Sequence, residues 1–402
     1  MSPKAVLAYS GGLDTSVAIK WLKERYDSEV IALTVDIGNV PDLEAIRQKA
    51  LDLGAIKALV IDAKKSFVNS FVFPALQADA LYEGQYPLAT AIGRPLIAQL
   101  MVDIAKKEGA TAVAHGCTGK GNDQVRLDVS VAALAPELKV IAPAREWNMT
   151  REQTIAYAQQ HNIPVPITKA SPYSIDENLW GRAIECGVLE DPWNEPPKNI
   201  FAWTKGPEET PDQPGYVEIG FEKGIPVSVN NENLNGVMLL QRIHQLAGEH
   251  GVGRIDHIEN RLVGIKSREV YEAPAAIVLL RAHQALEDLV LTKEQLRFKS
   301  KVASEYADLI YNGLWFSGLR QDLAAYVESS QRYVTGIVKV KLYKGNCQIA
   351  GRKSPYSLYS HSLATYDKGD VFDQSASPGF IHIWGLPVRT QAQVQSLFHQ
   401  KS

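Results

Sequence analysis

Short apolar runs alternate with amphipathic segments over the first 165 residues, and this alternation limits the possible fold more than any other feature. Apolar runs of strand length lie at 4–9, 30–35, 58–61, 111–114 and 139–142. Segments with helical spacing of apolar residues lie between or after them, at 15–26, 42–54, 94–108 and 150–161. Strands separated by helices predict an α/β fold with a parallel, doubly wound sheet. Ligands of such sheets bind beyond the carboxyl ends of the strands, so functional residues are expected in the loops that follow strands.

Single residues mark the ends of two of these helices. Pro95 is expected in the first turn of the helix over 94–108, and Gly109 is expected as its C-terminal cap. Thr150 and Gln153 form a capping-box pattern at the start of the last helix. These signals support the helical interpretation of both segments.

The pattern changes after Pro166. Six of the 21 prolines fall within 192–215, which predicts a long irregular connection. The expected elements beyond it are strands at 216–221 and 225–229, helices near 233–248, 273–290 and 292–311, a hairpin of 334–341 and 346–350, a strand over 380–384 and a short helix over 388–399. This mixture predicts an α+β region, and we expect domains at 1–166, 167–360 and 361–402.

The composition excludes several classes of protein. Of the 402 residues, 45% are hydrophobic and 22% are charged, which is typical of globular proteins. The net charge of −3 and the absence of a Lys/Arg cluster argue against nucleic-acid binding. No apolar run approaches the roughly 18 residues of a membrane-spanning helix, and the run Ala5–Tyr9 is too short for a signal peptide. Neither a nucleic acid nor a membrane is therefore expected as a partner.

The three cysteines are Cys117, Cys186 and Cys347. They form no CxxC pair, so neither a disulfide framework nor a cysteine zinc site is expected, and a reducing, cytoplasmic setting fits best. Cys117 lies close to His115, which suggests a nucleophile pair. We favour the alternative, in which both side chains line a buried strand end.

The segment Ser10–Ser16 (SGGLDTS) joins the first predicted strand to the first predicted helix. Two adjacent glycines allow a tight turn and a close approach of the backbone to a ligand. The helix N-terminus behind them offers free N–H groups and the positive end of the helix dipole. These features suit a phosphate or pyrophosphate, although the segment is neither a Walker loop nor a GxGxxG motif. The alternative is a small-residue turn capped by Asp14 or Thr15.

A second glycine-rich segment, His115–Arg126 (HGCTGKGNDQVR), follows the strand predicted at 111–114 and so falls on the same edge of the sheet. The guanidinium fork of Arg126 suits a carboxylate, and Asp123 suits an ammonium group. One short segment therefore offers groups for both ends of an amino acid. The alternative is that Asn122 and Asp123 only cap the next helix.

The first segment resembles the phosphate loop of the ATP pyrophosphatase (PP-loop) family, whose fold is of the adenine nucleotide alpha hydrolase type. Members of that family cleave ATP between the α and β phosphates and adenylate a substrate oxygen. Four segments in one order narrow the resemblance to the argininosuccinate synthase family: AYSGGLDTS at 8–16, HGCTGKGNDQVR at 115–126, SPYSIDENLWGR at 171–182 and GVGRIDHIENRLVGIKSREVYEAP at 251–274. The similarity extends from Lys4 to about Phe380.

This resemblance implies a ligase of arginine biosynthesis that joins citrulline to aspartate. It implies that ATP adenylates the ureido oxygen of citrulline with release of pyrophosphate, and that the aspartate amine then displaces AMP. Mg²⁺ is expected to accompany ATP. The resemblance further implies a PP-loop ATP-binding domain, a synthetase domain, and a C-terminal oligomerisation segment within a homotetramer.

The resemblance also implies the site residues, position by position. Those implied for ATP are Ala8, Tyr9, Ser10, Gly11, Gly12, Leu13, Asp14, Thr15, Ser16, Val35 and Gly116. Those implied for aspartate are Thr118, Asn122 and Asp123, and those implied for citrulline are Tyr86, Asn122, Arg126, Ser174, Glu259 and Tyr271. The residues expected to act in catalysis, through binding and electrostatics, are Ser10, Asp14, Asp123 and Arg126. No residue is an obvious general base, and no metal site formed by the protein is expected. Asp176 and Glu185 are further candidates for ligand contacts.

Two positions depart from the family pattern. Ala91 and Ala183 stand where relatives often carry a hydroxyl near citrulline, so these contacts are lost, replaced by water or supplied by a neighbour such as Thr90. Two other functions stay open. One is a different PP-loop adenylating enzyme, and the other is a non-catalytic nucleotide-binding module, against which the amino-acid-binding groups of the second loop argue.

Overall fold

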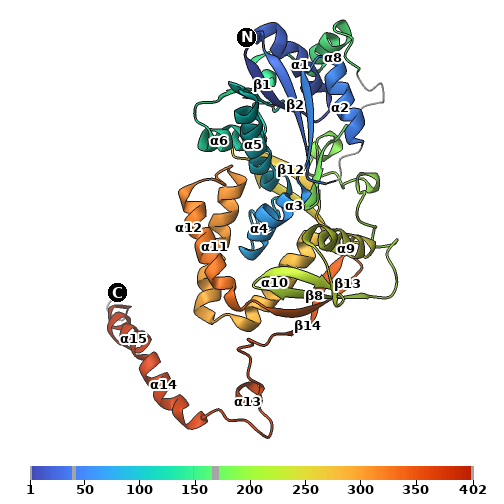
Figure 1. Ribbon diagram of the computed structural model, residues 1–402. Helices are drawn as coiled ribbons and strands as arrows, with labels where there is room; N and C mark the ends of the chain where they lie inside the picture. Colours follow the sequence, from blue (N-terminus) through green and yellow to red (C-terminus); the bar gives the residue numbers. More distant parts are fainter. Residues whose placement is uncertain (1, 39–41, 148, 165–171, 400–402) are drawn as a thin grey trace. The chain divides into compact units, whose positions relative to one another are not determined.

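The computed structural model describes residues 2–38, 42–147, 149–164 and 172–399 (Figure 1). The chain divides into two compact units, Met1–Tyr356 and Ser357–Ser402, and each is described by itself. Among the described residues, no helix combines the length and the apolar character that crossing a membrane requires.

A five-stranded parallel sheet, in the order β3-β2-β1-β4-β5, forms the N-terminal part of the first unit. Its strands are β1 (Lys4–Ala8), β2 (Glu29–Asp36), β3 (Lys57–Asp62), β4 (Ala112–Ala114) and β5 (Lys139–Ile141). The helices that cover it are α1 (Leu13–Tyr26), α2 (Leu43–Asp52) and α8 (Arg151–Gln160) on one face, and α5 (Ala89–Glu108) and α6 (Asp123–Leu134) on the other (Figure 1). Alternate residues of β1 enter the two cores, since Ala5 and Leu7 pack on one face and Val6 on the other. The predicted doubly wound sheet is confirmed.

The winding reverses at β1, because β2 and β3 lie on one side of it and β4 and β5 on the other. The loops after β1 and β4 therefore leave neighbouring strands at the same edge of the sheet. Open α/β sheets bind their ligands at such a point.

The later part of the first unit contains two antiparallel sheets, in the orders β11-β12-β7-β6 and β10-β9-β8-β13-β14. The first consists of β6 (Ser174–Asn178), β7 (Gly181–Glu185), β11 (Arg254–Asn260) and β12 (Lys266–Glu272). The second consists of β8 (Gly215–Glu222), β9 (Ile225–Val229), β10 (Glu232–Asn233), β13 (Gly336–Tyr343) and β14 (Asn346–Lys353). The long helices of this part are α9 (Gly236–Glu249), α10 (Pro274–Val290), α11 (Lys293–Tyr311) and α12 (Gly318–Ser330).

The connection from β3 to α5 belongs to the core of this later part and not to the parallel sheet. It contains α3 (Lys64–Phe67), the π-helical η1 (Val68–Val72) and α4 (Phe73–Gln77). Phe67 and Leu76 are fully buried in the same core as Leu279 of α10 and Val338 of β13. The remaining short elements are α7 (Pro143–Glu146), η2 (Gly187–Glu190), η3 (Lys198–Ile200) and η4 (Gln331–Tyr333). This insertion holds the loop that follows α4 against the later part of the unit.

Two structural predictions are wrong. Helix α5 begins at Ala89, after Leu88 in the left-handed conformation, so Pro95 lies inside the helix and not in its first turn. Burial of the added turn, including Ile92, outweighs the hydrogen bond that Pro95 cannot donate. The segment 380–384, predicted as a strand, is helical within α14 (Ser377–Trp384). Five apolar-rich residues do not distinguish the two structures by period.

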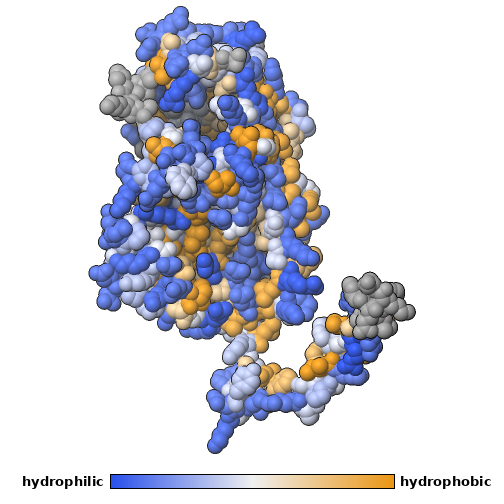
Figure 2. Space-filling model, turned by 180° about the vertical axis from the view of Figure 1, so that it is seen from behind, coloured by the Kyte–Doolittle hydropathy of each residue, from blue (hydrophilic) through white to orange (hydrophobic). Residues whose placement is uncertain are grey.

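The second unit consists of short helices, namely α13 (His361–Ala364), η5 (Gln374–Ala376), α14 and α15 (Leu386–His399). No residue of α13, η5 or α14 is buried. Apolar residues are exposed along this segment, as the space-filling view shows (Figure 2). The predicted helix over 388–399 lies within α15, whereas the predicted domain boundary at 166/167 lies outside the described residues.

Candidate active site

The loop after β1 is held in a tight turn in front of helix α1. Gly11 has a φ of +77°, a left-handed conformation that suits glycine. The Ser10 Oγ accepts a hydrogen bond from the Gly12 N–H at 3.3 Å and lies 3.2 Å from the Thr15 Oγ1. Lys49 of α2 donates to the Gly11 carbonyl oxygen at 2.7 Å. Because Gly12 is the N-cap of α1 and has no capping side chain, the first-turn N–H groups are available to an anion.

The loop after β4 lies against the first loop and is fixed by its own contacts. A Cβ at Gly116 would lie 2.9 Å from the Thr15 Cγ2, so the two loops approach closely there. The His115 Nε2 lies 2.7 Å from the Asp128 Oδ1, and the His115 Nδ1 accepts from the Cys117 N–H at 3.2 Å. Burial raises the pKa of the Cys117 thiol to about 12, so the thiol is protonated at neutral pH. These contacts favour a structural role for His115 and Cys117 over a nucleophile pair.

Both loops line a cavity of about 600 Å³, together with one face of the sheet β11-β12-β7-β6. Every residue implied for ATP, aspartate or citrulline lines this cavity except Gly11 and Ser16. Ser16 is buried, and its hydroxyl lies 3.3 Å from the Tyr9 Oη. The structure thus brings the predicted residues together, and the ligand assigned to each stays a prediction.

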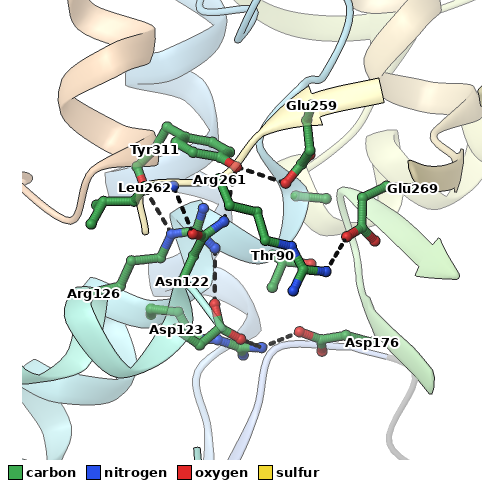
Figure 3. A network of polar contacts seen from close by, with 12 residues as sticks. Thr90, Asn122, Asp123, Arg126, Asp176, Glu259, Arg261, Leu262, Glu269 and Tyr311 are labelled. Carbon is green, nitrogen blue, oxygen red and sulfur yellow. Dashed lines mark hydrogen bonds and ion pairs between the residues drawn. The ribbon is translucent and has the colours of Figure 1, made fainter. Parts of the chain in front are cut away.

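A chain of opposite charges lies among the residues that line the cavity (Figure 3). Arg94 of α5 donates to the Asp123 Oδ2 at 2.7 Å and also pairs with Asp176. The Arg126 Nη1 donates to the Asp123 Oδ1 at 2.9 Å. Burial alone would raise the pKa of Asp123, but Arg94 and Arg126 lower it to about 2. Burial and the charge of Asp123 raise the pKa of Asp176, against the effect of Arg94.

Glu259 is held by hydroxyl groups on both of its carboxylate oxygens. The Tyr271 Oη donates to the Glu259 Oε2 at 2.5 Å, and the Tyr311 Oη donates to the Glu259 Oε1 at 2.7 Å. The ring of Tyr86 stacks on that of Tyr271, with 4.2 Å between centroids. A carboxylate fixed in this way, with lone pairs left over, suits a substrate ammonium group.

Two carboxylates share one guanidinium at another wall of the cavity. The Arg261 Nη2 pairs with Glu185 and donates to the Glu269 Oε1 at 2.8 Å. Burial, with the charges of Glu185 and Glu259, raises the pKa of Glu269 to about 9, although Arg261 opposes the shift. One arginine cannot neutralise both acids, so Glu269 favours its protonated form.

Reasoning from the sequence missed Arg94, Arg261, Glu269 and Tyr311. Period-two alternation was a usable signal for Glu269, because residues 269 and 271 of β12 share a face, but the polar sequence KSREVYE hides the strand. No signal in the sequence pointed to Tyr311.

Ala91, Ala183 and Thr90 are the positions at which the sequence analysis considered a hydroxyl contact with citrulline, and two of them line the cavity. Ala183 and Thr90 line it, whereas Ala91 is fully buried. The Thr90 hydroxyl forms a hydrogen bond with Asp176.

One cluster of possible metal ligands lies outside this cavity. Single donor atoms of Asp79, His283 and Glu287 lie within 4.8 Å of one another. Lys299 occupies the same place, since its Nζ pairs with Asp79 and lies 2.8 Å from the Glu287 Oε1. The cluster is therefore a buried ion-pair network and not a metal site.

Comparison with known proteins identifies the family to which this chain belongs. A family model described as the arginosuccinate synthase N-terminal HUP domain matches residues 4–164, and one described as the arginosuccinate synthase C-terminal domain matches residues 173–391. The chain belongs to the argininosuccinate synthase family. The resemblance drawn from four sequence segments is thereby confirmed.

Individual argininosuccinate synthases match almost the whole chain. One from Dehalococcoides mccartyi is 63% identical over 401 residues, which cover 100% of this chain and 99% of the relative. One from Symbiobacterium thermophilum is 61% identical over 393 residues, with 98% of each chain covered. One from Gloeobacter violaceus is 59% identical over 393 residues, covering 98% of this chain and 99% of the relative. The argininosuccinate synthase assignment therefore applies to the full length of the chain and not to one domain.

Proposed function

We propose that this enzyme condenses L-citrulline with L-aspartate at the expense of ATP, giving argininosuccinate, AMP and pyrophosphate. The observation that carries the proposal is a single cavity that joins a phosphate-type loop to an amino-acid-binding set of charges. This cavity belongs to a chain that matches argininosuccinate synthases over its full length.

In the first step, the ureido oxygen of citrulline attacks the α-phosphorus of ATP. The bond between the α-phosphorus and the bridging oxygen breaks, and pyrophosphate leaves with that oxygen. The N-terminus of α1 and the hydroxyls of Ser10 and Thr15 would bind the leaving pyrophosphate. Val35, at the end of β2, and Gly116 would contact the nucleotide.

In the second step, the neutral amine of aspartate attacks the activated ureido carbon. A carbon–nitrogen bond forms, the carbon–oxygen bond to AMP breaks, and the attacking nitrogen gives up a proton. Asp123, held ionised by two arginines, would bind the aspartate ammonium group before this step, with Thr118 and Asn122 beside it. Placing the reactants in one cavity supplies much of the acceleration.

Mg²⁺ is the expected companion of ATP, and the donor atoms at the first loop fit it. The carboxylate of Asp14 and the hydroxyls of Ser10 and Thr15 offer only oxygen ligands, which Mg²⁺ prefers together with phosphate oxygens. Burial raises the pKa of Asp14, partly opposed by Arg151, so a nearby cation would favour its ionised form. When bound, Mg²⁺ neutralises phosphate charge.

The remaining proposals concern the assembly. We infer an ATP-binding domain at 1–166, a synthetase domain at 167–360 and a C-terminal arm at 361–402 that contacts neighbouring subunits of a homotetramer. Exposed apolar residues along the arm support this arrangement, because short helices without a core of their own are unstable in water.

The deciding experiment is the exchange of labelled pyrophosphate into ATP, with Mg²⁺ and without aspartate. Exchange that depends on citrulline is the expected result, since it requires a reversible citrullyl-adenylate. Formation of AMP only after aspartate is added would keep the overall reaction and restrict the intermediate to the full complex. No AMP under any combination of substrates would refute the proposed enzyme and favour a nucleotide-binding module.

A further inference from the structure

Tyr311 is the last residue of α11 and is fully buried behind the wall of the cavity. Its hydroxyl lies between two groups proposed to bind citrulline (Figure 3). The Asn122 Nδ2 donates to the Tyr311 Oη at 2.9 Å, and the Tyr311 Oη donates to the Glu259 Oε1 at 2.7 Å. Tyr311 is not among the residues that line the cavity. It therefore reaches the substrate site only through its neighbours.

The directions of these hydrogen bonds are fixed by the surrounding groups. The Leu262 N–H donates to the Asn122 Oδ1 at 3.0 Å, so the amide of Asn122 must present its NH₂ group to Tyr311. The phenol oxygen thus accepts from Asn122, and its single proton goes to Glu259. Tyr271 occupies the other oxygen of Glu259. The orientations of Asn122 and Glu259 are therefore coupled through one hydroxyl group.

The backbone and ring of Tyr311 also hold Arg126. The Arg126 Nε donates to the Tyr311 carbonyl oxygen at 2.8 Å, and the guanidinium carbon lies 4.8 Å from the centre of the Tyr311 ring. A Cβ at Gly313, two residues further on, would lie 2.7 Å from the Arg126 Cα, so this close approach requires glycine there. The ring of Tyr82 stacks on Tyr311 with 3.6 Å between centroids and 4° between planes.

The side chain of Asn122 could instead cap its own helix, and the hydrogen bond to Tyr311 opposes this. It occupies the N-cap position of α6, where an asparagine side chain ordinarily accepts a hydrogen bond from the backbone N–H groups of the first turn. Here it forms no such bond. Without the phenol hydroxyl, the amide of Asn122 loses one of the two contacts that turn it away from its own helix.

We propose that Tyr311 is a positioning residue, which orients Asn122 from the second loop and Glu259 from the antiparallel sheet for the binding of citrulline. The proposal rests on the proposed function, since it assigns Tyr311 to the citrulline part of that site. It places the hydroxyl group, and not the ring, in this role.

The test compares Tyr311→Phe with Tyr306→Phe in the full-length enzyme. Both residues lie on α11, both are buried, and the Tyr306 hydroxyl accepts from Arg320 at 3.5 Å, away from the cavity. Tyr311→Phe keeps the ring that stacks on Tyr82. We expect it to raise the KM for citrulline about 10- to 100-fold, as for a lost hydrogen bond to a charged group, and to leave the KM for ATP within about twofold. Tyr306→Phe is expected to change neither value.

Several outcomes would overturn the proposal. An unchanged KM for citrulline would show that the hydroxyl does not position the site. An equal rise in both KM values would indicate general loosening of the fold. If Tyr311→Phe does not fold, 4-aminophenylalanine at position 311 keeps the ring and a donor to Glu259 but offers Asn122 a poor acceptor, so a raised KM for citrulline alone is expected. A KM for citrulline equal to that of the wild type, or raised together with that for ATP, would overturn the proposal. Absence of AMP formation by the wild-type enzyme under any combination of substrates would refute the proposed function itself, and this inference with it.

Discussion

Asp123 shows how one residue combines several constraints at the site. Burial works against its charge, but two guanidinium groups lower its pKa to about 2. It is therefore ionised throughout the neutral range, as a group that binds an ammonium ion must be. In the proposed mechanism this charge binds the second amino-acid substrate, because the first step involves ATP and citrulline alone.

Asp123→Asn is expected to separate the two steps. Citrulline-dependent exchange of pyrophosphate should stay within about threefold of wild type, because the amide oxygen still accepts from Arg126. The kcat/KM for aspartate should fall about 10- to 100-fold, as for a lost charge-assisted hydrogen bond. Asp128→Asn is the matched control, since it makes the same change on the same helix outside the cavity. It should affect both rates alike, and an equal loss of both rates in Asp123→Asn would contradict the assignment.

The raised pKa of Glu269 predicts that the stability of the folded protein depends on pH. Its pKa is raised to about 9 in the folded protein from an ordinary value near 4.5, first by burial and then by Glu185 and Glu259. A group with a raised folded pKa contributes stability that is complete below the unfolded pKa and is lost as the pH rises through the folded pKa. The wild-type protein should therefore lose stability from Glu269 between about pH 4.5 and pH 9.

Glu269→Gln should remove this loss, because glutamine resembles the protonated acid and does not ionise. The melting temperature of the variant minus that of the wild type should grow by a few degrees from pH 5 to pH 9 and then level off. The same substitution at the exposed Glu222 of β8 should give no such trend. A difference that stays constant with pH would show that Glu269 is ionised throughout.

At the level of single residues, the sequence predicted the site where chemistry and local spacing coincide. Asn122, Asp123 and Arg126 lie within five consecutive residues, so the sequence alone predicted that they act together. Arg94 and Tyr311 reach the same groups from separate helices, and such contacts depend on tertiary packing that spacing does not encode. Residues that tertiary packing brings to the site from separate elements are therefore the ones that sequence reasoning misses.

At the level of elements, strands with apolar runs were predicted and strands with polar faces were not. The strands of the parallel sheet are covered on both faces and read as continuous apolar runs. Strands β6 and β11 carry charged side chains, because one face of their sheet lines the cavity. The function of that face hides its period. The prediction of a strand over 380–384 is wrong for a different reason, since the apolar residues of this helical segment are too few to define a period.

The close approach of the loops after β1 and β4 predicts the effect of a single methyl group. In Gly116→Ala, the added Cβ would lie 2.9 Å from the Thr15 Cγ2, and Thr15 must shift within the phosphate loop. The KM for ATP should rise about 10-fold, as for modest overpacking. Gly119→Ala in the same loop is the matched control, because its Cβ would meet no atom closer than 4.0 Å. Equal KM values for ATP in the two variants would show that ATP binding does not depend on the close approach of the two loops.

At the level of the whole molecule, the two units differ in what stabilises them. Unit 1 has large buried cores, whereas α13, η5 and α14 of unit 2 contain no buried residue. Helices of 14 residues or fewer are marginal in water unless they pack on something. The exposed side chains of Ile381, Ile383 and Trp384 are the apolar surface available for such packing. The arm is therefore expected to pack on another surface, and a neighbouring subunit is the surface that we propose.

The double substitution Ile383→Asp with Trp384→Asp should therefore weaken the assembly. Light scattering after size-exclusion chromatography is expected to give a tetramer for the wild type and a smaller species for the variant. The far-UV circular dichroism should be nearly unchanged, because the side chains of Ile383 and Trp384 are 69% and 74% exposed, respectively, within one chain. Tyr366→Ser is the matched control, since Tyr366 is 100% exposed but lies outside the helices of the arm. A variant that keeps the wild-type mass would move the interface away from α14, and the apolar surface of that helix would then need another partner.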